Sequence, residues 1–69
     1  MVIESVKRNL NKKIVYKSIA DVYKLTGCML RKGENGFYYQ AELLDTLNGN
    51  SLIICKLDDI EEDIQQTLP

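Results

Sequence analysis

The 69-residue chain contains no histidine, one proline and only two cysteines. Without histidine, neither a Ser-His nor a Cys-His nucleophile pair can form, and two distant cysteines do not supply the usual ligand sets for zinc. A metal site would have to be built from carboxylates. The richest acidic cluster, residues 58–63, is interpreted as helix capping and solvation. We therefore expect a protein that is not an enzyme and that holds no metal or cofactor.

The sequence also lacks any apolar run near the ~18 residues needed to cross a bilayer. Its first ten residues, MVIESVKRNL, contain no apolar block followed by small residues, as a secretory signal would. The expectation is a cytoplasmic protein without membrane contact. In that compartment Cys28 and Cys55 are expected to be buried, reduced thiols.

What is present suits a small folded domain. Hydrophobic residues make up 45% of the chain and charged residues 28%, a balance typical of globular proteins. A domain of this size buries only ~60% of the surface that its unfolded chain exposes, so its core must be efficient. We expect one domain, in which an N-terminal segment (1–11) precedes a β-barrel (12–57) and a short C-terminal helix (58–69).

The period-two alternation of apolar residues and the turn signals predict four strands. The expected strands are residues 12–17, 22–32, a segment that begins at Phe37, and 51–57. Gly27 in the second of these indicates a bulge or a sharp bend. KGENG (32–36) and the Asn48-Gly49 pair predict the two hairpin turns that follow.

The strand alternation also separates two faces. In the third strand, Phe37, Tyr39, Ala41 and Leu43 share one side and are predicted to be core residues. The opposite side is apolar as well. Together with the fourth strand it would present four residues on an outer face: Tyr38, Leu44, Leu52 and Ile54.

Both ends of the chain contain patterns that a short helix would explain. Residues 1–10 fit either a short helix, with Ile3, Val6 and Leu10 on one stripe, or an extended arm. At the other end, Asp58 with Glu61 three residues later fits a helix start, which predicts a closing helix over 58–69.

Four strands in a meander, one of them bent at a glycine, with a helical turn at the end, resemble the SH3-like small barrel of KOW and Tudor-type modules. The resemblance covers residues 10–60 and is carried by element order, hairpin chemistry and chain length, without a family motif. It implies a mostly β fold, a small SH3-like barrel of four to five antiparallel strands. The five-stranded oligonucleotide-binding barrel is a variant that usually needs a longer chain.

Two hypotheses of function follow. In the first, the apolar outer face (Tyr38, Leu44, Leu52 and Ile54) binds another protein or a second copy of the chain as a homodimer. The alternative explanation of this face is that the chain's own ends cover it within one molecule.

In the second hypothesis the protein binds nucleic acid. Residues 1–33 carry eight basic and two acidic side chains, a net charge of +6, whereas residues 34–69 carry one basic and eight acidic ones, a net charge of −7. Tyr16, Tyr23 or Tyr38 could stack on bases while basic residues contact phosphates. The basic candidates are Lys12, Lys13, Lys17, Lys24, Arg31 and Lys32. The acidic second half and the pI near 5.2 favour the protein partner over nucleic acid.

Overall fold

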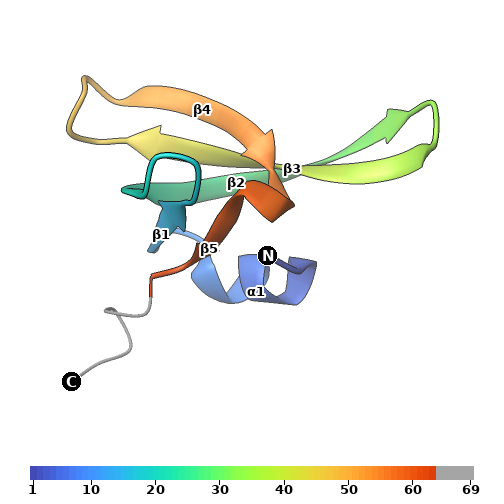
Figure 1. Cartoon of the computed structure of the whole chain (residues 1–69), viewed down its shortest axis with the longest axis horizontal. Helices are drawn as coiled ribbons and strands as arrows, with labels where there is room; N and C mark the ends of the chain where they lie inside the picture. Colours follow the sequence, from blue (N-terminus) through green and yellow to red (C-terminus); the bar gives the residue numbers. More distant parts are fainter. Residues whose placement is uncertain (64–69) are drawn as a thin grey trace.

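The computed structural model describes residues 1–63 and contains one antiparallel sheet with a short helix against it (Figure 1). Its elements are α1 (Ile3–Asn9), β1 (Lys13–Tyr16), β2 (Asp21–Gly33), β3 (Gly36–Asp45), β4 (Ser51–Lys56), the 3₁₀ turn η1 (Leu57–Asp59) and β5 (Ile60–Glu62). The strand order is β4-β3-β2-β1-β5. The mostly β fold and the four expected strands are confirmed. The described strands form an open sheet, with β4 and β5 as its edges, rather than a closed barrel.

Both predicted hairpin turns are present. The β2–β3 turn closes with Gly33 opposite Gly36, and Gly36 has a φ of 112°, which only glycine adopts without strain. In the β3–β4 turn the buried carboxylate of Asp45 accepts hydrogen bonds from the backbone N–H of Leu47 (3.1 Å) and the side-chain amide of Asn48 (2.7 Å). These bonds satisfy a charge that would otherwise be buried without a partner.

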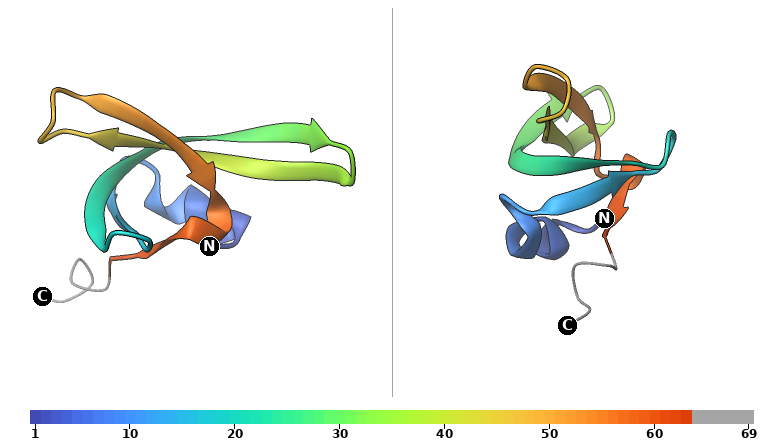
Figure 2. Two further views of the ribbon diagram at one scale, coloured as in Figure 1. Left: turned by 45° about the horizontal axis from the view of Figure 1, so that its top comes forward. Right: turned by 90° about the vertical axis from the view of Figure 1, so that its left-hand side faces the viewer.

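The bulge predicted at Gly27 is also confirmed. The β2–β3 register shifts between Leu25 and Gly27, and the Thr26 hydroxyl donates to the Glu42 carbonyl (3.2 Å) or carboxylate (2.9 Å) across the irregularity. The pairing of β2 with β1 is confined to residues 21–24, before the bulge, whereas its pairing with β3 begins at Lys24 and continues past the bulge to Gly33. One long strand therefore belongs to two parts of the sheet, and the sheet curves around the core (Figure 2).

The core lies on the inner face of this curved sheet, where α1 packs. Ile14, Leu25, Ala41 and Leu43 are fully buried there, and Val6 of α1 is 1% exposed. Residues 1–10 had two interpretations from the sequence, and the helix is the correct one for Ile3–Asn9. An isolated seven-residue helix is marginal in water, so burial of its apolar side stabilises it.

The predicted C-terminal helix over 58–69 is wrong for the described residues. Residues 57–59 form a single 3₁₀ turn, and Ile60–Glu62 form β5, which pairs with β1 through Tyr16 opposite Ile60. The Asp59 carboxylate accepts a hydrogen bond from the Lys56 backbone N–H (3.3 Å), so the acidic residue caps a turn and not a helix. Residues 64–69 of that predicted helix lie outside the described part of the chain.

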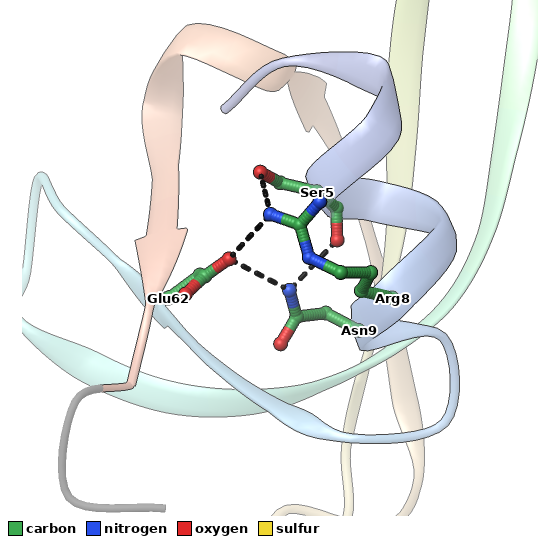
Figure 3. Close-up of polar contacts among 4 residues, drawn as sticks. All are labelled: Ser5, Arg8, Asn9 and Glu62. Atoms are coloured by element: carbon green, nitrogen blue, oxygen red, sulfur yellow. Dashed lines mark hydrogen bonds and ion pairs between the residues drawn. The ribbon is translucent and has the colours of Figure 1, made fainter. Parts of the chain in front are cut away.

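A polar cluster joins α1 to β5 at the open side of the curved sheet (Figure 3). The Glu62 carboxylate accepts hydrogen bonds from Asn9 (3.2 Å) and Arg8 (3.5 Å), and Arg8 also donates to the Ser5 hydroxyl (2.9 Å). The Arg8–Glu62 ion pair is exposed, so it contributes at most about 1 kcal/mol. Its main effect is to orient the short helix against the short edge strand.

The helix in the described chain is too short to span a membrane.

Candidate functional site

The predicted outer-face residues are only partly brought together. Leu44 of β3 lies directly opposite Leu52 of β4. Ile54 is two residues after Leu52 on the same face of β4 and lies opposite Glu42. Leu52 and Ile54 are exposed (59% and 48%), and Leu44 is half-buried beside them. We call Leu44, Leu52 and Ile54 the outer-face patch. No described end of the chain covers it, because α1 packs on the opposite face of the sheet.

Tyr38 is not part of this patch. It lies opposite Arg31, farther along β3, and the polar pair of Gln40 and Lys56 separates it from Ile54. Tyr38 shares the outer face by alternation, but it lies near the β2–β3 turn, where its cross-strand neighbour is Arg31. The four-residue site expected from the sequence is therefore two separate surfaces.

The basic residues proposed for nucleic acid are also divided. Lys13 and Lys24 are paired opposite each other on β1 and β2, and Lys12 adjoins them in the sequence. Arg31 and Lys32 lie near the β2–β3 turn. Lys24 and Arg31 are seven residues apart on β2, up to about 23 Å at ~3.3 Å per residue. Lys17 follows β1, where its backbone N–H donates to the Asp59 carbonyl (2.9 Å). These cations do not form one continuous patch.

The most unusual surface belongs to the β2–β3 hairpin, which continues well beyond the core (Figures 1 and 2). We call residues 29–40 the arm; the strands within it contain no buried residue. One face of the arm continues the face of β3 on which Ala41 and Leu43 are buried. On this face Leu30 lies opposite Tyr39, and Lys32 lies opposite Phe37. Phe37 is 70% exposed and Leu30 58%, so their side chains are uncovered although they point toward the core side of the sheet.

The prediction that Phe37 and Tyr39 are core residues is therefore wrong, although their face was predicted correctly. Ala41 and Leu43 on that face are completely buried, whereas Tyr39 is 40% exposed. The physical reason is length: the ten residues of β3 extend over about 33 Å, farther than a core of this size reaches.

An open groove of about 770 Å³ lies between the arm, the start of α1 and η1. Its apolar lining consists of Met1, Val2, Ile3, Phe37, Tyr38, Tyr39 and Leu57. The charged side chains around it are Glu4, Glu34 and Asp58 against Lys56 alone. The charge of the lining side chains is therefore −2, or −1 when the ammonium group of Met1 is included, on an apolar and aromatic floor.

Two sets of contacts hold the walls of this groove in place. The amino group of Met1 donates to the carbonyl oxygen of Leu57 (2.7 Å) and Ile60 (3.4 Å), which fixes the start of α1 against η1. In the arm, the Lys32 ammonium lies 5.9 Å from the centre of the Phe37 ring, within reach of a cation–π contact. The Met1 contacts thus hold one wall of the groove together, and the Lys32–Phe37 contact lies within the other.

The two thiols are not activated. Cys28 of β2 and Cys55 of β4 are both cross-strand neighbours of Ala41, which lies between them on β3. One intervening strand puts their Cα atoms about 9–10 Å apart, beyond the ~7 Å limit for a disulfide. Burial raises the pKa of both thiols, and Asp59 raises that of Cys55 further. A raised pKa reduces the thiolate fraction, so neither is a ready nucleophile.

Burial also raises the pKa of the Tyr23 phenol, with smaller contributions from the carboxylates of Asp21 and Asp45. The ring packs in the core, 6.1 Å from that of Tyr16, so neither of these two tyrosines is the freely presented stacking platform considered for nucleic acid. Among residues 1–63, no three acidic or thiol side chains come close enough to share a metal ion.

The groove was not predicted from the alternation of residues, but two other features of the sequence point to it. The first is the run Phe37, Tyr38 and Tyr39, in which consecutive aromatics occupy both faces of a strand. The second is the length of the predicted hairpin relative to a 69-residue chain. Val2 and Leu30, which are 64% and 58% exposed, had no signal of their own.

Comparisons of the chain with protein-family models, with curated proteins and with solved structures find no match.

Proposed function

We propose that this protein is a non-catalytic module that binds a segment of another polypeptide in the groove beneath the arm. The observation that carries the proposal is the uncovered apolar side of the arm, where Leu30, Phe37 and Tyr39 face the groove side of the sheet without packing on the core. Covering the exposed parts of these three side chains would contribute roughly 3 kcal/mol before the entropy of association is subtracted.

The charges around the groove suggest the chemistry of the partner. Glu4, Glu34 and Asp58 surround an apolar floor, and Lys56 is the single basic side chain among the lining residues. A segment with aliphatic or aromatic anchors flanked by lysine or arginine would match both the floor and the rim. The outer-face patch remains a proposed second contact surface on the opposite side of the sheet.

We also propose that the fold is a variant of the SH3-like small barrel. A four-stranded meander, a 3₁₀ turn after β4 and a short β5 that returns to pair with β1 support this assignment. The bend of β2 at Gly27 supports it as well, because it divides the sheet into two parts around the core. In this interpretation α1 fills the open side of the barrel, and the arm is an extended β2–β3 hairpin.

The proposal is tested by selecting binders from a random peptide library displayed on phage, with the intact chain as bait. Recovered peptides should combine apolar anchors with basic residues, and synthetic copies should bind less tightly to Phe37→Ser and to Glu4→Lys. The matched control is Leu47→Ser, which removes a side chain that is 89% exposed in the distant β3–β4 turn and should leave binding unchanged. A library that yields no binder, or binders insensitive to Phe37→Ser, would contradict the proposal.

One observation favours nucleic acid as a second candidate: the arm carries Arg31 and Lys32 beside three aromatic side chains. The acidic rim of the groove argues against it, because carboxylates repel phosphates. A fluorescent single-stranded oligonucleotide distinguishes the two. Binding that falls steeply with salt and is lost in Arg31→Glu/Lys32→Glu, but persists in Glu4→Lys, would favour the nucleic-acid function.

A further inference from the structure

The two edges of the sheet differ in how they are protected from pairing with another strand. At one edge, β5 has only three residues, two of which are Glu61 and Glu62, and Glu62 is bonded to α1. Short length, charge and an adjoining helix are devices that discourage edge-to-edge association. This edge is therefore unsuited to receive a further strand.

The other edge, β4, is much less protected. Ser51–Lys56 reads SLIICK, with no proline, an unbroken register against β3 and a single charge at its end. In the described chain β4 pairs with β3 alone, and Figure 1 shows its far side without a neighbouring element. Apart from the Lys56 N–H, which donates to the Asp59 carboxylate, the outward backbone N–H and C=O groups of this apolar strand are thus available for hydrogen bonds with another chain.

The sequence of β4 matches itself in the antiparallel direction. Side chains that lie opposite each other in a sheet must share a face, so only registers that pair outer with outer residues are allowed. The register centred on Ile53 places Leu52 opposite Ile54 of the second copy on the outer face. On the inner face it places Ile53 opposite Ile53. It also places Lys56 opposite Asn50, so no like charges meet.

We propose that two copies of this chain associate by antiparallel pairing of their β4 strands, centred on Ile53, to form one continuous ten-stranded sheet. The pairing joins the two outer-face patches into a single apolar surface that crosses the two-fold axis. Like charges oppose the alternative in which the outer faces stack on each other, because Lys24, Arg31 and Lys56 share that face against Glu42. The groove beneath the arm is lined by other elements, apart from Lys56, so this assembly does not depend on the proposed peptide function.

Two double variants test the register. Leu52→Lys/Ile54→Lys places two pairs of like charges across the two-fold axis, whereas Leu52→Glu/Ile54→Lys places two pairs of opposite charges there. Both variants remove the same apolar side chains, and both put a lysine opposite Glu42 within the monomer. The two variants therefore differ mainly in whether the charges that meet between the two copies repel or attract each other.

The measurement is sedimentation equilibrium of the wild-type chain and both variants from micromolar to millimolar concentration, with far-UV circular dichroism to show that each is folded. Wild type should dimerise, and the dissociation constant of the lysine-lysine variant should exceed that of the glutamate-lysine variant by about tenfold or more, because each of two cross-strand pairs changes sign. Added salt should reduce the difference between the variants, and amide hydrogen exchange in β4 should slow on dimerisation.

Three results would overturn the proposal. A wild-type chain that is monomeric at millimolar concentration has no such interface. Equal loss of association in both variants would place the contact on the apolar faces instead of the strand edge, and equal retention would place it away from β4. The proposed peptide function is measured with different variants, so either idea can fail alone.

Discussion

The contrast between Leu43 and Phe37 gives the sharpest test of where the core ends. Both lie on the inner-facing side of β3, but Leu43 is completely buried and Phe37 is 70% exposed. Leu43→Ala should lower the free energy of unfolding by about 2–5 kcal/mol, as other buried leucines do. A domain of this length has roughly 3–10 kcal/mol in total, so this variant should be close to unfolded at room temperature.

Phe37→Ala should have a much smaller effect. Full burial of a phenylalanine contributes about 1.5–3 kcal/mol, and only the remaining 30% of the side-chain surface is covered, which gives about 0.5–1 kcal/mol. Loss of the exposed cation–π contact with Lys32, 5.9 Å from the ring centre, adds about 0.5 kcal/mol at most. The expected total is about 1 kcal/mol.

Urea unfolding followed by far-UV circular dichroism measures both variants. With a slope near 1 kcal/mol per M, Leu43→Ala should move the midpoint by about 2 M or more and Phe37→Ala by about 1 M. Leu47→Ala, in the exposed β3–β4 turn, serves as the control and should leave the midpoint unchanged. Equal losses for Leu43→Ala and Phe37→Ala would refute the reasoning, because they would mean that the arm packs against the core.

Three further predictions concern the backbone, the thiols and alkaline pH. Gly36→Ala, at a φ of 112°, should destabilise by about 1–2 kcal/mol in urea unfolding, whereas Gly27→Ala should be neutral or stabilising, because its new Cβ would meet Glu42 at an ordinary 3.7 Å. A thiol reagent should modify Cys55, which is buried, more slowly than half-buried Cys28, and both more slowly than a free cysteine, because burial raises their pKa. Because the pKa of Tyr23 is raised in the folded state, folding favours the neutral phenol. The stability that this contributes is present below about pH 10, the pKa of an unfolded tyrosine, and is lost as the pH rises above it. Tyr23→Phe should reduce the fall of the urea midpoint over that alkaline range.

The parts of the fold that the sequence predicted well are those with local physical causes. Gly36 and Gly49 adopt positive φ angles (112° and 71°) that few other residues tolerate, so the two hairpin turns could be placed without tertiary information. The bulge at Gly27 was visible for the same reason, and the structure shows the register shift there. Alternation along β3 assigned every side chain to its observed face.

The C-terminal segment was mispredicted because its pattern is compatible with two structures. Leu57 and Ile60 are three residues apart and both buried, which fits a helical stripe and also fits a 3₁₀ turn followed by a strand. A three-residue strand has no period of its own to detect. The strand conformation is selected by the free edge of β1, where Tyr16 pairs with Ile60. This long-range contact cannot be recognised from residues 57–62 alone.

Alternation predicts the direction of a side chain but not whether anything lies in that direction. Phe37 and Ala41 point to the same face of β3, and Cys55 of β4 lies opposite only the second of them. Burial depends on which neighbours reach that part of the hairpin, and β4 pairs with β3 only from Gln40 onward. The residues that define the groove are therefore those where the pattern of a core strand continues after the core has ended, and an arm with such a pattern is where we expect a partner to complete the packing.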